Sequence, residues 1–161
     1  MIRLQSISCT LVPIVPGKPI YVREDNPNIL AKGFRDYKKM DEEYRMQSIA
    51  QSIVPCPKIL DTVYEKGTGY IFMERIQGKM VYDHYGEHDI PSKVWKQIHS
   101  IVSKLFYHNL HYVDITPYNF MIEEETNKVY VIDFGHCYEQ KVNWFLKDFL
   151  EGENAWNPDF E

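Results

Sequence analysis

The sequence predicts an α+β protein in which short strands come first and helices follow. Residues 2–35 are rich in β-branched side chains and are interrupted by proline and glycine, a composition typical of short strands joined by turns. Beyond residue 36, apolar side chains recur at helical spacing in two long segments. Hydrophobic residues make up 44% of the chain and aromatic residues 14%, which is enough to build one folded domain.

The first half of the chain predicts strands around one helix. A strand is expected at 28–34 and a helix at 36–53, which Pro55 and Pro57 would stop. Two more strands, 58–64 and 69–76, are expected on either side of the turn 65–68. The expected apolar positions of the helix are Tyr37, Met40, Tyr44, Met46, Ile49, Ala50 and Ile53.

The second half is dominated by a helix expected at 92–110. A polar loop (111–119), a short strand (129–132) and a short helix (142–150) should follow it. Lys93, Lys96 and Lys104 fall on the polar side of the long helix. Its core-facing stripe is expected to be Val94, Ile98, Ile101, Val102, Leu105 and Phe106.

Charge and cysteine content limit the setting of the protein. A formal net charge of −5 gives no general attraction to nucleic acid or to an anionic membrane, so neither is expected as a partner. The three cysteines are widely spaced and odd in number, which favours a reducing, cytoplasmic location over a disulfide framework. The N-terminus has no signal-peptide pattern and no apolar run is long enough to span a membrane.

The residues with the clearest chemical meaning lie between 111 and 135. Asp114 and Asn119 are five positions apart in the predicted loop, and Asp133 directly follows the predicted strand and precedes Phe134 and Gly135. Phosphate transfer from ATP needs one carboxylate to orient the acceptor hydroxyl and oxygen ligands to hold magnesium on the phosphates. The alternative is that these residues only cap turns and end a strand.

This D-x-x-x-x-N segment, followed by a strand and D-F-G, resembles the catalytic and metal-binding loops of protein kinases. The resemblance implies ATP and Mg²⁺ as cofactors. It makes Asp114 the catalytic base, Asn119 a magnesium and nucleotide ligand, and Asp133 the principal metal ligand. It also implies a two-lobed fold, with a small antiparallel β-sheet lobe carrying one helix (1–75) and a truncated helical lobe (76–161).

Upstream residues extend the resemblance. Lys32 matches the kinase lysine that contacts the α- and β-phosphates, and Glu43 matches the glutamate that pairs with it, although the neighbouring Glu42 could take that role. The alternative is that Lys32 is an ordinary exposed lysine and that Glu43 belongs to a solvated helix face. The segment 70–78 resembles the kinase hinge, where the backbone at Glu74 and Ile76 would bind adenine beside Met73.

Several features depart from conventional protein kinases. No glycine-rich loop precedes Lys32, and the nearest turn, residues 16–19, contains two prolines that lack an amide hydrogen; the charge of Lys18 is its only substitute. The catalytic loop begins Tyr-Val-Asp in place of His-Arg-Asp, and Thr116 replaces a phosphate-contacting lysine. This loop is similar to those of RIO kinases and of the small kinase of the KEOPS complex. Residues 53–60 are similar to aminoglycoside phosphotransferases.

Three functions follow as expectations. The first is a reduced Ser/Thr protein kinase that uses ATP and magnesium on a protein substrate. The second is a pseudokinase or kinase mimic that regulates a protein partner, which the missing glycine loop and the short chain beyond Gly135 favour. The third is a small-molecule kinase of the aminoglycoside type. Reduced kinases of this kind also occur in large DNA viruses and phages, so a virus-encoded protein acting in a host cell fits the same residues.

Overall fold

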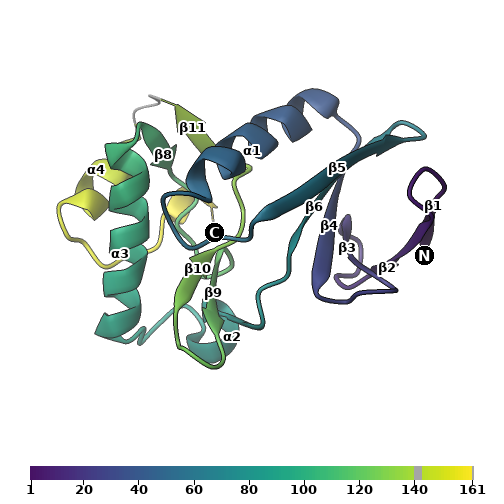
Figure 1. The fold of residues 1–161 in the computed structure, drawn as a ribbon. Coiled ribbons are helices and arrows are strands. Elements are labelled where there is room, and N and C mark those ends of the chain that lie inside the picture. Colours follow the sequence, from purple (N-terminus) through teal and green to yellow (C-terminus); the bar gives the residue numbers. More distant parts are fainter. Residues whose placement is uncertain (140–142, 161) are drawn as a thin grey trace.

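The structure is a computed structural model that describes residues 1–139 and 143–160. It confirms an α+β architecture: six antiparallel strands form one curled sheet, and short sheets and helices follow (Figure 1). The order of strands across the large sheet is β1-β2-β3-β4-β6-β5. These strands are β1 (Ile2–Leu4), β2 (Cys9–Pro13), β3 (Ile20–Arg23), β4 (Ile29–Phe34), β5 (Ile59–Glu65) and β6 (Thr68–Glu74).

The β5–β6 hairpin forms where the sequence predicts it. Strand β5 ends at Glu65 and pairs with Thr68, so only Lys66 and Gly67 form the loop. Both have positive φ angles, 52° and 79°, the backbone geometry that suits the twist of a two-residue hairpin. This hairpin fixes the register of β6 beside β4, which brings Lys32 opposite Ile71.

Helix α1 (Tyr37–Ala50) begins where the Asp36 side chain accepts hydrogen bonds from the backbone N–H groups of the first turn. It ends at Ala50, earlier than expected, so Pro55 and Pro57 do not stop it. The N–H groups of Ile53 and Val54 both donate to the Ala50 carbonyl at 2.9 Å, and this tight turn ends the helix.

The expected apolar stripe of α1 is only partly correct. Met40, Met46 and Ala50 are buried, but Tyr37, Tyr44 and Ile49 are exposed. Two polar residues, Glu43 and Gln47, are buried instead because each has a partner on the sheet side; Gln47 donates to the Pro57 carbonyl at 2.9 Å. The burial of polar side chains is possible only with such partners, which periodicity of apolar residues cannot reveal.

Helix α1 joins the two parts of the molecule. Its first half packs on β6, where Met40 contacts Ile71 and Met73 in a small buried cluster. Its second half contributes Met46 and Ala50 to the large core formed by the rest of the chain. The other face of the sheet is covered by its own curled edge in a separate cluster of Leu4, Cys9, Leu11, Ala31, Val63, Tyr70 and Phe72.

The C-terminal part contains two small sheets between helices. Strand β9 (Phe120–Glu123) lies between β7 (Gly78–Met80) and β10 (Val129–Val131), and β8 (Leu110–Tyr112) pairs with β11 (Cys137–Glu139). The helices of this part are α2 (Val81–Tyr85), α3 (Ser92–Tyr107), α4 (Trp144–Leu150) and a final 3₁₀ turn, η1 (Pro158–Phe160).

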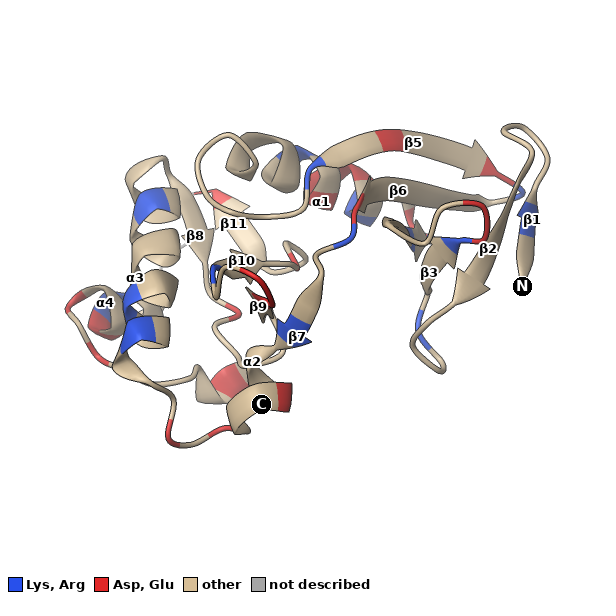
Figure 2. Ribbon diagram, turned by 60° about the horizontal axis from the view of Figure 1, so that its bottom comes forward, with Lys and Arg blue, Asp and Glu red and all other residues tan. Residues whose placement is uncertain are grey.

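Helix α3 confirms the long expected helix, with two corrections. It ends at Tyr107, because residues from Leu110 onward form strand β8. Phe106 is 42% exposed and so lies outside the core, whereas Trp95 is buried against Trp156 and Phe149. The expected lysines are exposed, and Figure 2 marks lysine and arginine positions on α3 in blue.

Helix α4 forms within the expected range 142–150 and begins at Asn143, whose side chain caps it. Val142 lies outside the described residues. Cys9, Cys56 and Cys137 are all buried and free, which agrees with the expected absence of a disulfide framework. Across residues 1–139 and 143–160, no helix has the length and apolar character needed to cross a membrane.

Candidate functional site

The candidate site is centred on Lys32, which contacts carboxylates from both parts of the chain. Its Nζ lies 2.8 Å from Glu43 Oε2 on α1 and 3.4 Å from Asp133 Oδ1 beyond β10. Alternation along β4 points Lys32 to the face that packs on α1, together with Leu30 and Phe34. The expected Lys32–Glu43 ion pair is therefore present, and Glu42 is exposed on the same helix.

Burial and charge set the protonation of this cluster. Burial lowers the pKa of Lys32, but Glu43 and Asp133 together outweigh it, so its pKa is raised and it stays charged. Burial raises the pKa of Glu43, and Lys32 opposes this rise. The net shift of the Glu43 pKa is upward because the negative charge of Asp133 adds to the effect of burial, and a bound cation would offset the repulsion between these two carboxylates.

Asp133 is held in place by hydrogen bonds to its side-chain carboxylate and to its main-chain carbonyl. Its Oδ1 accepts a hydrogen bond from Gly135 N–H at 2.8 Å, and its main-chain carbonyl accepts one from Tyr112 Oη at 2.6 Å. Tyr112 is completely buried and its ring packs edge-on against Phe134. No role for Tyr112 is predicted from the sequence, because a hydrogen bond to a main-chain carbonyl requires no particular residue pattern.

The loop after β8 carries Asp114 and Asn119. Asn119 Nδ2 donates to the Asp114 carbonyl oxygen at 2.9 Å, and the Thr116 N–H donates to the same atom at 3.1 Å. The Asn119 carbonyl in turn accepts from Ile132 N–H at 3.0 Å, which ties this loop to the chain just before Asp133. The two segments that sequence analysis singled out are thus held next to each other.

Asp114 is partly buried and its carboxyl group is electrostatically perturbed. Burial raises its pKa, hydrogen bonds from Asn119 and Thr116 lower it, and the negative charge of Asp133 raises it further. The net direction is upward, which is the direction expected for a carboxylate that must accept a proton near neutral pH.

The backbone around Glu74 and Ile76 lies at the end of β6. The Glu74 N–H donates to the Lys58 carbonyl at 2.9 Å, and the Arg75 N–H donates to Asn28 at the same distance. Within residues 1–139 and 143–160, the Ile76 N–H forms no backbone hydrogen bond. Met73 is buried one residue before Glu74, next to Gln47.

The turn between β2 and β3 stands in the place of a glycine-rich loop. The N–H groups of Ile14, Lys18 and Ile20 all donate to carbonyls within residues 14–20. Pro16 and Pro19 have no N–H. Few backbone donors in this turn are therefore left to bind phosphate.

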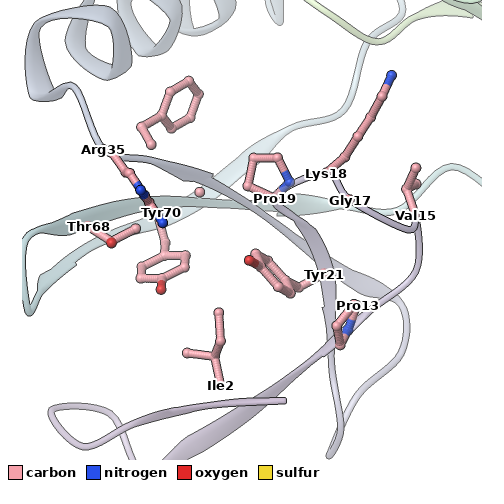
Figure 3. A pocket seen from close by; sticks show the side chains of 12 residues that line it. Ile2, Pro13, Val15, Gly17, Lys18, Pro19, Tyr21, Arg35, Thr68 and Tyr70 are labelled. Atoms are coloured by element: carbon pink, nitrogen blue, oxygen red, sulfur yellow. The ribbon is translucent and has the colours of Figure 1, made fainter.

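A cavity of about 550 Å³ lies beside this turn (Figure 3). Tyr21 and Tyr70 form part of its wall, and Lys18 and Arg35 supply its positive charges. None of Lys32, Asp114 and Asp133 lines it. Since the chemistry of the candidate site depends on those residues, we place the site at the Lys32 cluster.

The side-chain oxygens of Asn119 and Asp133 are the atoms that could bind magnesium. Asn119 uses its amide nitrogen on the loop, so its side-chain oxygen is the atom left for a cation. A Cβ placed on Gly135 would lie 3.2 Å from both Asp133 Oδ1 and Glu43 Oε1, so the glycine keeps this space clear. Among the described residues, no group of three or more His, Cys, Asp or Glu could hold a metal. Magnesium bound by one or two protein oxygens, water and nucleotide phosphates fits this pattern.

Comparison with known proteins finds two relatives that match about half of this chain. The chain is 31% identical over 88 residues to a Mus musculus protein called sperm motility kinase Tcr mutant form, covering 52% of this chain and 18% of the relative. It is 27% identical over 85 residues to EKC/KEOPS complex subunit BUD32 of Encephalitozoon cuniculi, and the match covers 53% of this chain and 40% of the relative. The matched region thus spans less than half of either relative. No family model matches the chain.

Over about half of its length, the chain is therefore similar to proteins of the protein-kinase-like superfamily.

Proposed function

We propose that this chain is an ATP- and magnesium-dependent phosphotransferase that acts on serine or threonine hydroxyls of a protein. In this proposal, residues 1–75 form the small lobe of a kinase-like fold and residues 76–161 form a truncated large lobe. The observation that carries the proposal is Lys32, which contacts Glu43 and Asp133 at once. A lysine held between two carboxylates is fixed and charged, as phosphate binding requires.

Asn119 and Asp133 would hold magnesium on the nucleotide phosphates. When bound, the ion neutralises phosphate charge and orients the transferred group. Asp133 is 39% exposed, so its carboxylate is accessible to an ion, and the Tyr112 and Gly135 hydrogen bonds fix its direction. Lys32 would contact the phosphates, and Glu43 would hold Lys32 in place.

Asp114 would orient the acceptor hydroxyl and take its proton. Its raised pKa makes it a better base than an ordinary aspartate, and its backbone is held by Asn119. The adenine ring would lie against Met73 and bind the backbone at Glu74 and Ile76, where the Ile76 N–H has no backbone acceptor among the described residues.

A second function is a pseudokinase that binds a regulated protein partner. The turn at residues 14–20 favours it, because this turn uses most of its N–H groups internally and contains two prolines. A loop with few free donors would stabilise the transferred phosphate poorly. A pseudokinase can bind nucleotide without transferring phosphate, so the assay must separate transfer from binding.

The first prediction compares phosphate transfer from labelled ATP by wild type and Asp114→Asn. We expect Asp114→Asn to lower turnover by about 10²–10⁴-fold, because a general base acts mainly on the transition state. The ATP affinity should stay close to that of wild type, since Asp114 faces the acceptor. Acceptors should include the chain itself, generic proteins and cell extracts.

A pseudokinase would give a different result. If ATP binds but wild type and Asp114→Asn are equally inactive with every acceptor, the enzyme proposal fails. Glu87→Gln is a suitable control variant, because Glu87 is a carboxylate outside the Lys32 cluster whose side chain interacts with Tyr118. Its turnover should match that of wild type.

A further inference from the structure

The segment after α4 lies against the loop that carries Asp114. Asn157 is completely buried, with 0% of its surface exposed. Its Nδ2 donates to the Val113 carbonyl at 2.8 Å, and its backbone N–H donates to the Ile115 carbonyl at 2.8 Å. One residue thus holds the carbonyls on both sides of Asp114.

The orientation of the Asn157 amide is fixed by its neighbours. The Val113 carbonyl can only accept a hydrogen bond, so it must face the amide nitrogen. The Asp159 N–H can only donate, and it lies 3.1 Å from Asn157 Oδ1. In the reversed orientation, Asn157 Oδ1 would face the Val113 carbonyl oxygen, and Asn157 Nδ2 would face the Asp159 N–H. Neither pair could form a hydrogen bond, so both contacts require the observed orientation.

Three consecutive carbonyls are therefore held by asparagine residues. Asn157 Nδ2 binds Val113 O, Asn119 Nδ2 binds Asp114 O, and the Asn157 N–H binds Ile115 O. The main chain at Asp114 has few ways to rotate while these contacts persist, so the direction of its side chain is set from two separate segments.

We infer that Asn157 is a positioning residue that fixes the loop of Asp114 for phosphate transfer. The inference rests on the proposed function. This role also explains why position 157 is asparagine and not aspartate. An ionised aspartate has the same shape, but it could not donate a hydrogen bond to the Val113 carbonyl and would place a negative charge against that oxygen. The sequence alone offered no pattern that connects Asn157 with Asp114.

The neighbouring Trp156 supplies a control in the same segment. Its ring packs on Trp95 with centroids 4.4 Å apart, and its Nε1 donates to the Glu87 carbonyl at 3.0 Å, away from residues 113–115. Trp156→Phe removes that hydrogen bond but keeps an aromatic ring. It therefore perturbs the segment but leaves both Asn157 hydrogen bonds to the Asp114 loop in place.

The test compares wild type, Asn157→Ala, Asn157→Asp and Trp156→Phe by turnover, ATP affinity and hydrogen exchange. Both Asn157 variants should lower kcat by on the order of 10²-fold, the effect of misplacing a catalytic group by about 1 Å. Their affinity for ATP with magnesium should stay near wild type. Amides in residues 113–119 should exchange faster in both variants but not in Trp156→Phe.

Asn157→Asp distinguishes a hydrogen bond from packing, because its shape matches asparagine. A packing role predicts that it retains more activity than Asn157→Ala, and that result would overturn the inference. The inference would also be overturned if the amides of residues 113–119 exchanged as slowly in Asn157→Ala as in wild type. Hydrogen exchange needs no turnover, so an inactive wild type would defeat the proposed function while the loop contact is still tested. A melting temperature shows whether Asn157→Asp folds. If it does not fold, Asn157→Ala still tests the inference, because it adds no buried charge.

Discussion

At the scale of single residues, Lys32 depends on Glu43 for its position. Glu43 is only 6% exposed and contacts Lys32 at 2.8 Å, whereas Asp133 is farther away and more exposed. A buried carboxylate is stable only while its partner is present, so the two residues should be energetically coupled.

We therefore predict that Glu43→Gln weakens binding of ATP with magnesium and lowers the free energy of unfolding. The loss of stability should be about 1.5–3 kcal/mol, the usual range for hydrogen bonds to charged groups. Glu42→Gln is the matched control, because Glu42 is adjacent and exposed. Calorimetry and chemical denaturation measure both effects. Equal effects of the two substitutions would exclude a special role for Glu43.

The charged and polar residues of the candidate site could be picked out from the sequence, but the residues that hold their main chain in place could not. Lys32, Glu43, Asp114, Asn119 and Asp133 stand out because chemistry-bearing residues keep recognisable spacing. Tyr112 and Asn157 bind main-chain carbonyls, and such contacts require no particular sequence pattern. They could be found only once the chain segments were placed together.

At the scale of elements, strand β7 is held unusually close to β9. A Cβ on Gly78 would lie 2.0 Å from the backbone oxygen of Ile122, a distance that no side chain can occupy. This contact connects the end of the segment 70–78 to the strand that follows Asn119. A glycine is required there by close approach of the two backbones.

Gly78→Ala should therefore destabilise the protein by about 1–3 kcal/mol, as overpacking usually does. The strand glycine Gly33 provides the control, because its nearest contacts to an added Cβ are side-chain atoms at 3.4 Å. Thermal unfolding should show a clear drop in melting temperature for Gly78→Ala and a smaller change for Gly33→Ala. The reverse order would contradict the close packing of β7 on β9.

The long elements formed near their expected ranges, and so did the short strand β10 and the short helix α4, whereas other short strands were not predicted. Helices α1 and α3 and the β5–β6 hairpin appear near their expected ranges because periodicity and turn chemistry extend over many residues. Strands β7, β8 and β11 have three residues each, too few for a period to be recognised. Phe106, which was expected in the core, is exposed, and Trp95, which is absent from the expected stripe, is buried because its ring packs against Trp156 and Phe149.

At the scale of the whole molecule, α1 and the Lys32 cluster connect the two parts of the chain. Helix α1 packs on the sheet through Met40 and on the C-terminal core through Met46, and Arg45 forms an ion pair with Glu139 on β11. The same helix carries Glu43. Its position therefore determines whether Lys32, through Glu43, is held near Asp133, which the proposed nucleotide binding requires.

The central claim is that magnesium-dependent nucleotide binding takes place at this junction. Isothermal titration calorimetry of ATP, with and without magnesium, tests it most directly in wild type, Asp133→Asn and the exposed control Asp148→Asn on α4. We predict tight binding only with magnesium in wild type and Asp148→Asn, and a sharp loss in Asp133→Asn. Unchanged magnesium-dependent affinity in Asp133→Asn, or no binding by wild type, would contradict the claim.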